Sequence, residues 1–160
     1  MGKINWKHVF LIGLILGVIE TWLQLFNAML FAADEIWEFR AMLHAPGGIG
    51  GWHMILTFLA YILVGIATVW LYAAIRPRYG PGPRTAAIAG FVMWLVTVAA
   101  HVQWTSAMPY FRTGALVVTA LVSMPIFVGA TVFCVSAYKE TEEFTGAAES
   151  EGAATEPAEG

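Results

Sequence analysis

The chain has 160 residues, of which 59% are hydrophobic and only 12% are charged, and its formal net charge is −3. Soluble domains carry about 25% charged residues and roughly 45–50% apolar ones, and a soluble chain this short cannot bury so much apolar surface. The composition therefore excludes an ordinary soluble domain and predicts an integral membrane protein. Its spans must be α-helical, because unpaired backbone groups cannot be hydrated inside a bilayer.

The net charge combines two unlike parts of the chain. Seven acidic residues and no basic ones follow Lys139, so residues 1–139 carry eight basic and four acidic side chains. Residues 140–160 are rich in Glu, Ala and Gly and have almost no apolar anchors. We predict a transmembrane domain over 1–139 and a disordered acidic tail over 140–160.

Four apolar stretches each approach the roughly 20 residues that a helix needs to cross a bilayer core. They cover about residues 8–33, 52–75, 85–105 and 114–138, which predicts a four-helix transmembrane bundle. Lys and Arg in short loops favour the cytoplasmic side, and six of the eight lie on the side of the two termini. We therefore expect a multi-pass protein of the cell (plasma) membrane with both termini in the cytoplasm.

The first span carries a polar stripe. Gly13 and Gly17 form a GxxxG pattern, which lets another helix backbone approach closely. Glu20, Gln24 and Asn27 continue the same face at helical spacing, so this face is predicted to contact protein. Glu20 lies near the middle of the span, where an acid is costly unless it is protonated, paired or hydrated. It is a proton carrier, an ion ligand or a counter-ion for a basic group, or else a neutral acid that holds helices together.

Two histidines suggest a cofactor site. His53 lies near the outer end of the second span and His101 near the outer end of the third, so both are predicted in the outer leaflet at similar depth. Such a pair could hold a haem between facing helices, or a metal ion together with Glu38 or His44. The sequence lacks HxxxH, ExxH and CxxCH motifs. The alternative is a pair of interfacial histidines bonded to backbone or lipid headgroups, and we expect no cofactor.

Helical spacing also groups residues on the second and third spans. Gly90, Trp94, Thr97, His101 and Trp104 share one face of the third span, and His53, Thr57, Ala60, Val64 and Thr68 share one face of the second. These two faces carry the candidate histidines. Trp22, Trp70 and Trp94 do not lie at predicted interfaces and are expected to pack inside the bundle or to form the wall of a pocket.

Arg76, Arg78 and Arg84 lie in a stretch rich in proline and glycine. Prolines lack an N–H donor and glycines are costly in helices, so the sequence predicts a cytoplasmic basic loop over 76–84. The loop determines topology and touches anionic lipid, or it docks an acidic partner or the acidic tail.

The sequence contains no nucleophile motif and no nucleic-acid-binding motif. The leading hypothesis is a non-enzymatic membrane protein, an accessory subunit of a larger membrane complex or a self-associating bundle, with the polar stripe holding helices or a partner in register. One alternative is a redox protein that binds haem or a metal through His53 and His101. The other is a small proton-coupled carrier that uses Glu20.

Overall fold

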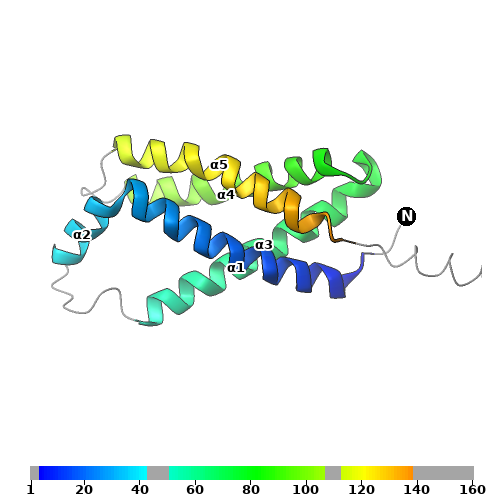
Figure 1. Ribbon diagram of the computed structural model, residues 1–160, viewed down its shortest axis with the longest axis horizontal. Helices are drawn as coiled ribbons and strands as arrows, with labels where there is room; N and C mark the ends of the chain where they lie inside the picture. Colours follow the sequence, from blue (N-terminus) through cyan, green and yellow to red (C-terminus); the bar gives the residue numbers. More distant parts are fainter. Residues whose placement is uncertain (1–3, 43–50, 107–112, 139–160) are drawn as a thin grey trace, which may run out of the picture.

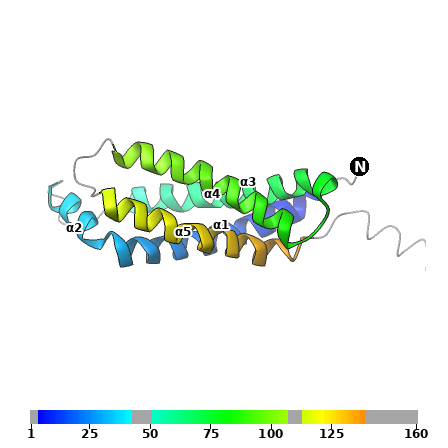
Figure 2. The same ribbon diagram turned by 90° about the horizontal axis from the view of Figure 1, so that it is seen from above.

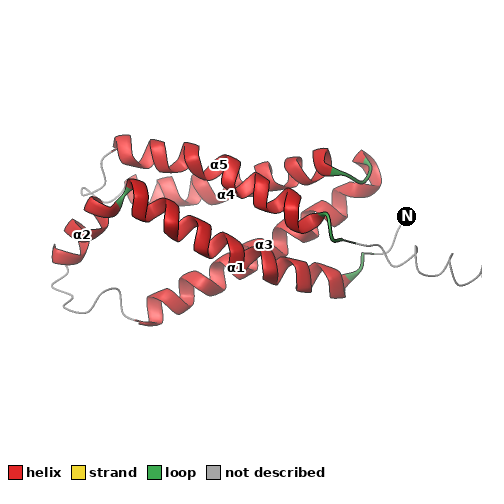
Figure 3. Cartoon of the chain, in the orientation of Figure 1, coloured by secondary structure: helices red, strands yellow, loops and turns green. Residues whose placement is uncertain are grey.

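The computed structural model describes residues 4–42, 51–106 and 113–138, which form helices and short connections. The helices, drawn in Figures 1 and 3, are α1 (Trp6–Phe31), α2 (Ala33–Met42), α3 (Gly51–Tyr79), α4 (Pro83–Ser106) and α5 (Thr113–Val135). By length and composition, α1, α3, α4 and α5 can each cross a membrane. The prediction of an all-helical, four-helix transmembrane bundle is confirmed, and the protein is a multi-pass membrane protein. The predicted acidic tail lies outside the described residues.

The four long helices pack lengthwise (Figures 1 and 2). α1 packs against α3 and α5, and α4 packs against α5 and α3. The start of α1, the turn between α3 and α4 and the end of α5 lie together at one end, here called the terminal end. α2 and the first turns of α3 and α5 lie at the opposite end, here called the α2 end.

The bundle is held most tightly where α1 crosses α3. A Cβ atom added to Gly17 would lie 2.5 Å from the Cα of Ile62, and one added to Gly65 would lie 2.5 Å from the backbone N of Gly17 and overlap the carbonyl oxygen of Gly13. The two backbones are therefore in direct contact. The close approach predicted from Gly13 and Gly17 is confirmed, and Gly65 is the partner on α3 that allows it.

The three arginines predicted to lie in a loop lie on helix ends instead. α3 continues through Pro77 to Tyr79, so Arg76 and Arg78 belong to its last turn, and Arg84 belongs to the first turn of α4. Proline removes one backbone hydrogen bond, but its φ angle is compatible with a helix. The backbone ladder resumes after it, because the N–H of Gly80 donates to the carbonyl of Arg76 at 2.8 Å. A single proline near the end of this helix therefore does not terminate it.

The turn between α3 and α4 is built on two glycines. Gly80 and Gly82 have φ angles of 82° and 138°, which residues with a side chain rarely adopt. The hydroxyl of Thr85 donates to the carbonyl of Gly80 at 2.7 Å, and Pro83 occupies the first position of α4, where its missing N–H is not needed. The turn is short, so α3 and α4 are antiparallel neighbours.

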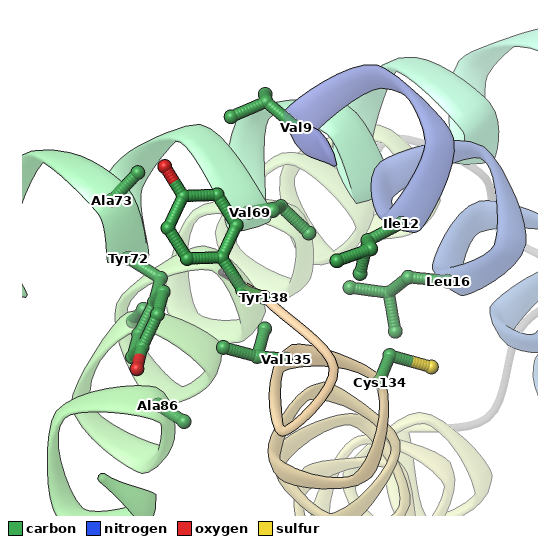
Figure 4. Packing of buried hydrophobic residues seen from close by; sticks show 11 residues of the cluster. Val9, Ile12, Leu16, Val69, Tyr72, Ala73, Ala86, Cys134, Val135 and Tyr138 are labelled. Atoms are coloured by element: carbon green, nitrogen blue, oxygen red, sulfur yellow. The ribbon is translucent and has the colours of Figure 1, made fainter. Parts of the chain in front are cut away.

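A buried apolar cluster fills the terminal half of the bundle (Figure 4). It comprises Val9, Ile12, Leu16, Val69, Tyr72, Ala73, Ala86, Ala89, Cys134, Val135 and Tyr138. The residues come from α1, α3, α4, α5 and the short segment that follows α5. Side chains therefore pack the terminal half across all four long helices.

Tyr138 closes this cluster at the terminal end. Its hydroxyl accepts a hydrogen bond from the backbone N–H of Asn5 at 3.1 Å. Its ring meets Tyr72 edge to face, with 5.8 Å between ring centroids, and the guanidinium of Arg76 lies 5.7 Å from its ring centroid. Tyr138 thus ties the chain after α5 to the start of α1 and the end of α3.

Candidate functional site: an intramembrane cleft above Glu20

The α2 half of the bundle contains a cleft between α1, α3, α4 and α5 with a volume of about 370 Å³. Its polar lining consists of Gln24, Thr97, Thr119 and Ser123, and its aromatic lining of Tyr61, Trp94 and His101. The other lining residues are alanines, valines and a leucine. All of them lie on the α2 side of the apolar cluster, so the bundle is packed in one half and hollow in the other.

The cleft brings together helix faces that helical spacing had grouped. Trp94, Thr97 and His101 of α4 all line it, as do Ala60 and Val64 of α3. Gly90 of α4 and Thr57 and Thr68 of α3, which share these helical faces, are not among the residues that line it. α1 contributes Gln24, one turn beyond Glu20.

Glu20 lies on α1 between Leu16 of the apolar cluster and Gln24 of the cleft wall, and its side chain is fully buried. One carboxyl oxygen, Oε2, accepts a long hydrogen bond of 3.5 Å from Nε2 of Gln24. No described residue hydrogen-bonds to the other oxygen, Oε1. Gln24 lines the cleft, so one wall residue hydrogen-bonds to the buried acid, while Glu20 itself is not among the lining residues.

The described residues supply no basic side chain to this carboxyl, since Gln24 is its one hydrogen-bonding side chain among them. A carboxylate buried without a partner costs several kcal/mol. The group must therefore hold a proton or pair with a cation that enters from the cleft. The protonation of Glu20 can therefore depend on whether a cation occupies the cleft.

Asn27 is a second buried polar residue on α1, two helical turns beyond Glu20. It is buried, and its Nδ2 donates to the backbone carbonyl of Thr119 on α5 at 3.1 Å. Its Oδ1 and the hydroxyl oxygen of Thr119 are buried, and neither has a hydrogen-bond partner among the described residues. Buried polar atoms without partners are rare in proteins, so this junction of α1 and α5 has unused hydrogen-bonding capacity.

Ser123 fixes one wall of the cleft. Its hydroxyl donates to the carbonyl of Ala120 at 2.7 Å and accepts from the indole N–H of Trp94 at 2.9 Å. This link joins α5 to α4 and sets the orientation of the indole. The sequence alone does not indicate that Ser123, Thr119 and Tyr61 belong to the site, because single hydroxyl residues in apolar helices follow no periodic pattern.

Replacing Ser123 with alanine should lower the free energy of unfolding by about 1–3 kcal/mol, because the half-buried indole N–H of Trp94 loses its acceptor. Ser136→Ala is the matched control. The hydroxyl of Ser136 also donates to the carbonyl three residues earlier, but it is exposed on the surface. Thermal unfolding in detergent, followed by tryptophan fluorescence, should show a clear loss for S123A and almost none for S136A. Equal losses would contradict the role assigned to the indole contact.

His101 lines the cleft, whereas His53 lies on α3 near its start. His53 precedes Tyr61, a residue on the same cleft, by eight positions, which is about 12 Å of helix rise. The side chain of His53 and all of His44 lie outside the described part of the chain. No group of three or more His, Cys, Asp or Glu side chains that could hold a metal occurs among the described residues. Haem or metal binding by His53 and His101 stays an alternative hypothesis that these residues do not test.

Comparison with protein-family models, curated proteins and solved structures finds no match to this chain. The site must therefore be interpreted from its own geometry.

Proposed function

We propose that the protein is a small carrier that binds a solute in the cleft and couples its binding to a proton at Glu20. One observation carries the proposal: a fully buried carboxyl with an unpartnered oxygen lies beside an intramembrane cleft and accepts a hydrogen bond from the wall residue Gln24. Ionisable residues inside membrane helices commonly mark ion, proton or substrate pathways. An acid used only to hold helices together would have its hydrogen bonds satisfied by neighbouring helices.

The size and lining of the cleft support solute binding. Its volume of about 370 Å³ falls within the range of ligand pockets, which is about 300–1,000 Å³. Ligand pockets are mainly apolar with a few fixed polar groups, and this cleft combines alanines and valines with Gln24, Thr119 and Ser123. The packed terminal half acts as the closed end of a pathway, and transport requires that end to open in a second state.

We further propose that the terminal end faces the cytoplasm. Lys7, Arg78 and Arg84 are exposed at that end, and Arg76 lies beside them over Tyr138. Positive side chains next to membrane spans favour the cytoplasmic side. The cleft would then receive solute from the outer half of the membrane.

A second candidate function is self-association or binding to a larger membrane complex. The first half of α3 diverges from the other helices in Figure 1, and it exposes the large apolar side chains of Trp52, Met54, Ile55, Leu56, Leu59 and Leu63. Lipid or another transmembrane helix can cover this surface. The native mass of the protein, extracted in mild detergent, separates the two cases.

The carrier proposal is tested by replacing Glu20 with glutamine, which keeps the size of the side chain and removes its acidity. Glu38→Gln is the matched control, because Glu38 lies on α2 and is exposed. Purified variants are reconstituted in liposomes with an entrapped pH-sensitive dye and challenged with an alkyl amine, an amino acid, a sugar and a carboxylate, each alone. We expect at least one solute to drive proton flux through wild type and E38Q, and this flux should fall to background in E20Q. Equal flux in E20Q and wild type would overturn the proposal.

A further inference from the structure

We propose that the solute of this cleft is a small linear organic cation with N–H groups at both ends, such as a protonated diamine. The inference rests on the proposed function and names its substrate class. It follows from the hydrogen-bonding capacity, the charge and the spacing of the groups around the cleft.

The hydrogen-bonding capacity left unused around the cleft consists mainly of acceptors. The protein uses several of its own donors internally: the amide of Asn27 donates to the carbonyl of Thr119, the indole of Trp94 donates to Ser123, and the hydroxyl of Thr97 donates to backbone carbonyls of its own helix. Near the cleft, the buried atoms without a hydrogen-bond partner among the described residues are the hydroxyl oxygen of Thr119 on the wall and, behind the wall on α1, Glu20 Oε1 and Asn27 Oδ1. All of these are oxygens that can accept a hydrogen bond. A solute that satisfies them must bring donors.

The charge around the cleft selects against anions. No Lys or Arg lines the cleft in the described part of the chain, and the buried carboxyl of Glu20 hydrogen-bonds to the wall residue Gln24. In a membrane interior, a carboxylate attracts a cation strongly and repels carboxylates and phosphates. The rings of Tyr61, Trp94 and His101 add aromatic surface, which also favours cations over anions.

The spacing of the acceptors favours a solute with two separated donor groups. Glu20 and Asn27 are seven residues apart on α1, which is about 10 Å of helix rise and nearly two full turns. They therefore lie on the same face, with Gln24 between them on the cleft wall. A linear cation can place one N–H group toward Glu20 and the other toward Asn27 and Thr119. A compact cation with one donor group can contact either Glu20 or the pair Asn27 and Thr119, but not both.

The test measures thermal unfolding of the purified protein in detergent with three probes of equal chain length. The probes are 1,4-diaminobutane, the neutral 1,4-butanediol and the dianion succinate. A ligand that binds the folded state raises the unfolding temperature. We expect the diamine to raise it for wild type and for E38Q, and we expect no rise with the diol or with succinate.

Two variants assign the effect to the cleft. E20Q should lose the diamine-induced rise. Thr119→Val keeps the shape of the side chain and removes a hydroxyl that has no partner, so the fold should tolerate it. Its diamine affinity should fall by about threefold to tenfold, as expected for the loss of one hydrogen bond. T119V keeps the proposal falsifiable if E20Q folds poorly.

Three results would overturn the proposal: no rise with the diamine, an equal rise with the diol or succinate, or diamine binding unchanged in T119V or in folded E20Q. The flux experiment separates this failure from that of the proposed function. If E20Q abolishes proton flux while the diamine does not bind, the carrier role stands and the substrate class is wrong. If E20Q leaves flux unchanged, the carrier role itself fails.

Discussion

Replacing Gly65 with alanine should lower the free energy of unfolding by about 1–3 kcal/mol, the usual cost of an extra group in a tightly packed contact. The new Cβ would overlap the carbonyl oxygen of Gly13 and lie 2.5 Å from the backbone N of Gly17. Both are backbone atoms, so no side chain can rotate away to relieve the clash. α1 and α3 must move apart, and Gly65→Leu should have a still larger effect.

Gly129→Ala is the control for this experiment. Gly129 is also within a long helix, but a Cβ added there would meet nothing within 4 Å. Alanine favours helix over glycine by up to about 1 kcal/mol, so G129A should be as stable as wild type or slightly more stable. Unfolding in mixed micelles of mild detergent and dodecyl sulfate, followed by circular dichroism, gives both values. If G65A proved as stable as G129A, the backbone contact between α1 and α3 would be refuted.

The same crossing also shapes the site. Gly17 and Ile62 are in contact one turn before Glu20 on α1 and one residue after Tyr61 on α3. The close approach of the backbones therefore sets the distance between the buried carboxyl and the phenol on the cleft wall. Beyond this point α3 diverges, which opens the α2 half of the bundle (Figure 1). The close contact of α1 and α3 at Gly13, Gly17 and Gly65 thus accounts for the packed terminal half and for the open α2 half beyond it.

Much of the fold could be predicted from the sequence, because membrane helices must be apolar over about 20 residues. The number of spans and the approach of another helix at Gly13 and Gly17 follow from that rule and from small-residue spacing. The residue at which α3 ends was harder to predict. Pro77 and the glycines after it indicate a break, but the helix stops only at Tyr79, before Gly80 adopts a positive φ.

Only some residues of the candidate site could be predicted from the sequence. Glu20 is conspicuous because it is an acid in an apolar span, and Trp94, Thr97 and His101 repeat at helical spacing. Tyr61, Thr119 and Ser123 are ordinary residues in such helices. Their place on the cleft depends on how each helix is rotated in the bundle, and a single sequence does not encode that rotation in its periodicity.

The single cysteine of the chain makes the cleft directly testable. Cys134 is buried in the apolar cluster, so Cys134→Ala provides a cysteine-free background into which one thiol can be introduced at a time. Thiols react with charged methanethiosulfonates as thiolates, and thiolates form only where water reaches them. A new cysteine therefore reports whether its position is hydrated.

In this background, Ala120→Cys should react rapidly with a membrane-impermeant cationic methanethiosulfonate, because Ala120 lines the cleft. Leu121→Cys is the adjacent control. Leu121 is 63% exposed on the outer apolar surface of α5, where lipid excludes water. Ala89→Cys is the control for the packed half, since Ala89 is fully buried there. We expect labelling of A120C only, with a difference in rate of at least about tenfold for each control, because both control positions exclude the water that thiolate formation needs.

Labelling of intact cells also reports the orientation of the protein in the membrane. With the terminal end in the cytoplasm, the cleft lies toward the outside, so reagent added outside the cell should label A120C. Labelling of A120C only after the cells are opened would reverse the orientation and leave the hydrated cleft intact. Equal, slow labelling of A120C and L121C would mean that water does not enter the cleft. Glu20 could then exchange no proton through it, and the buried acid would serve only to hold the helices together.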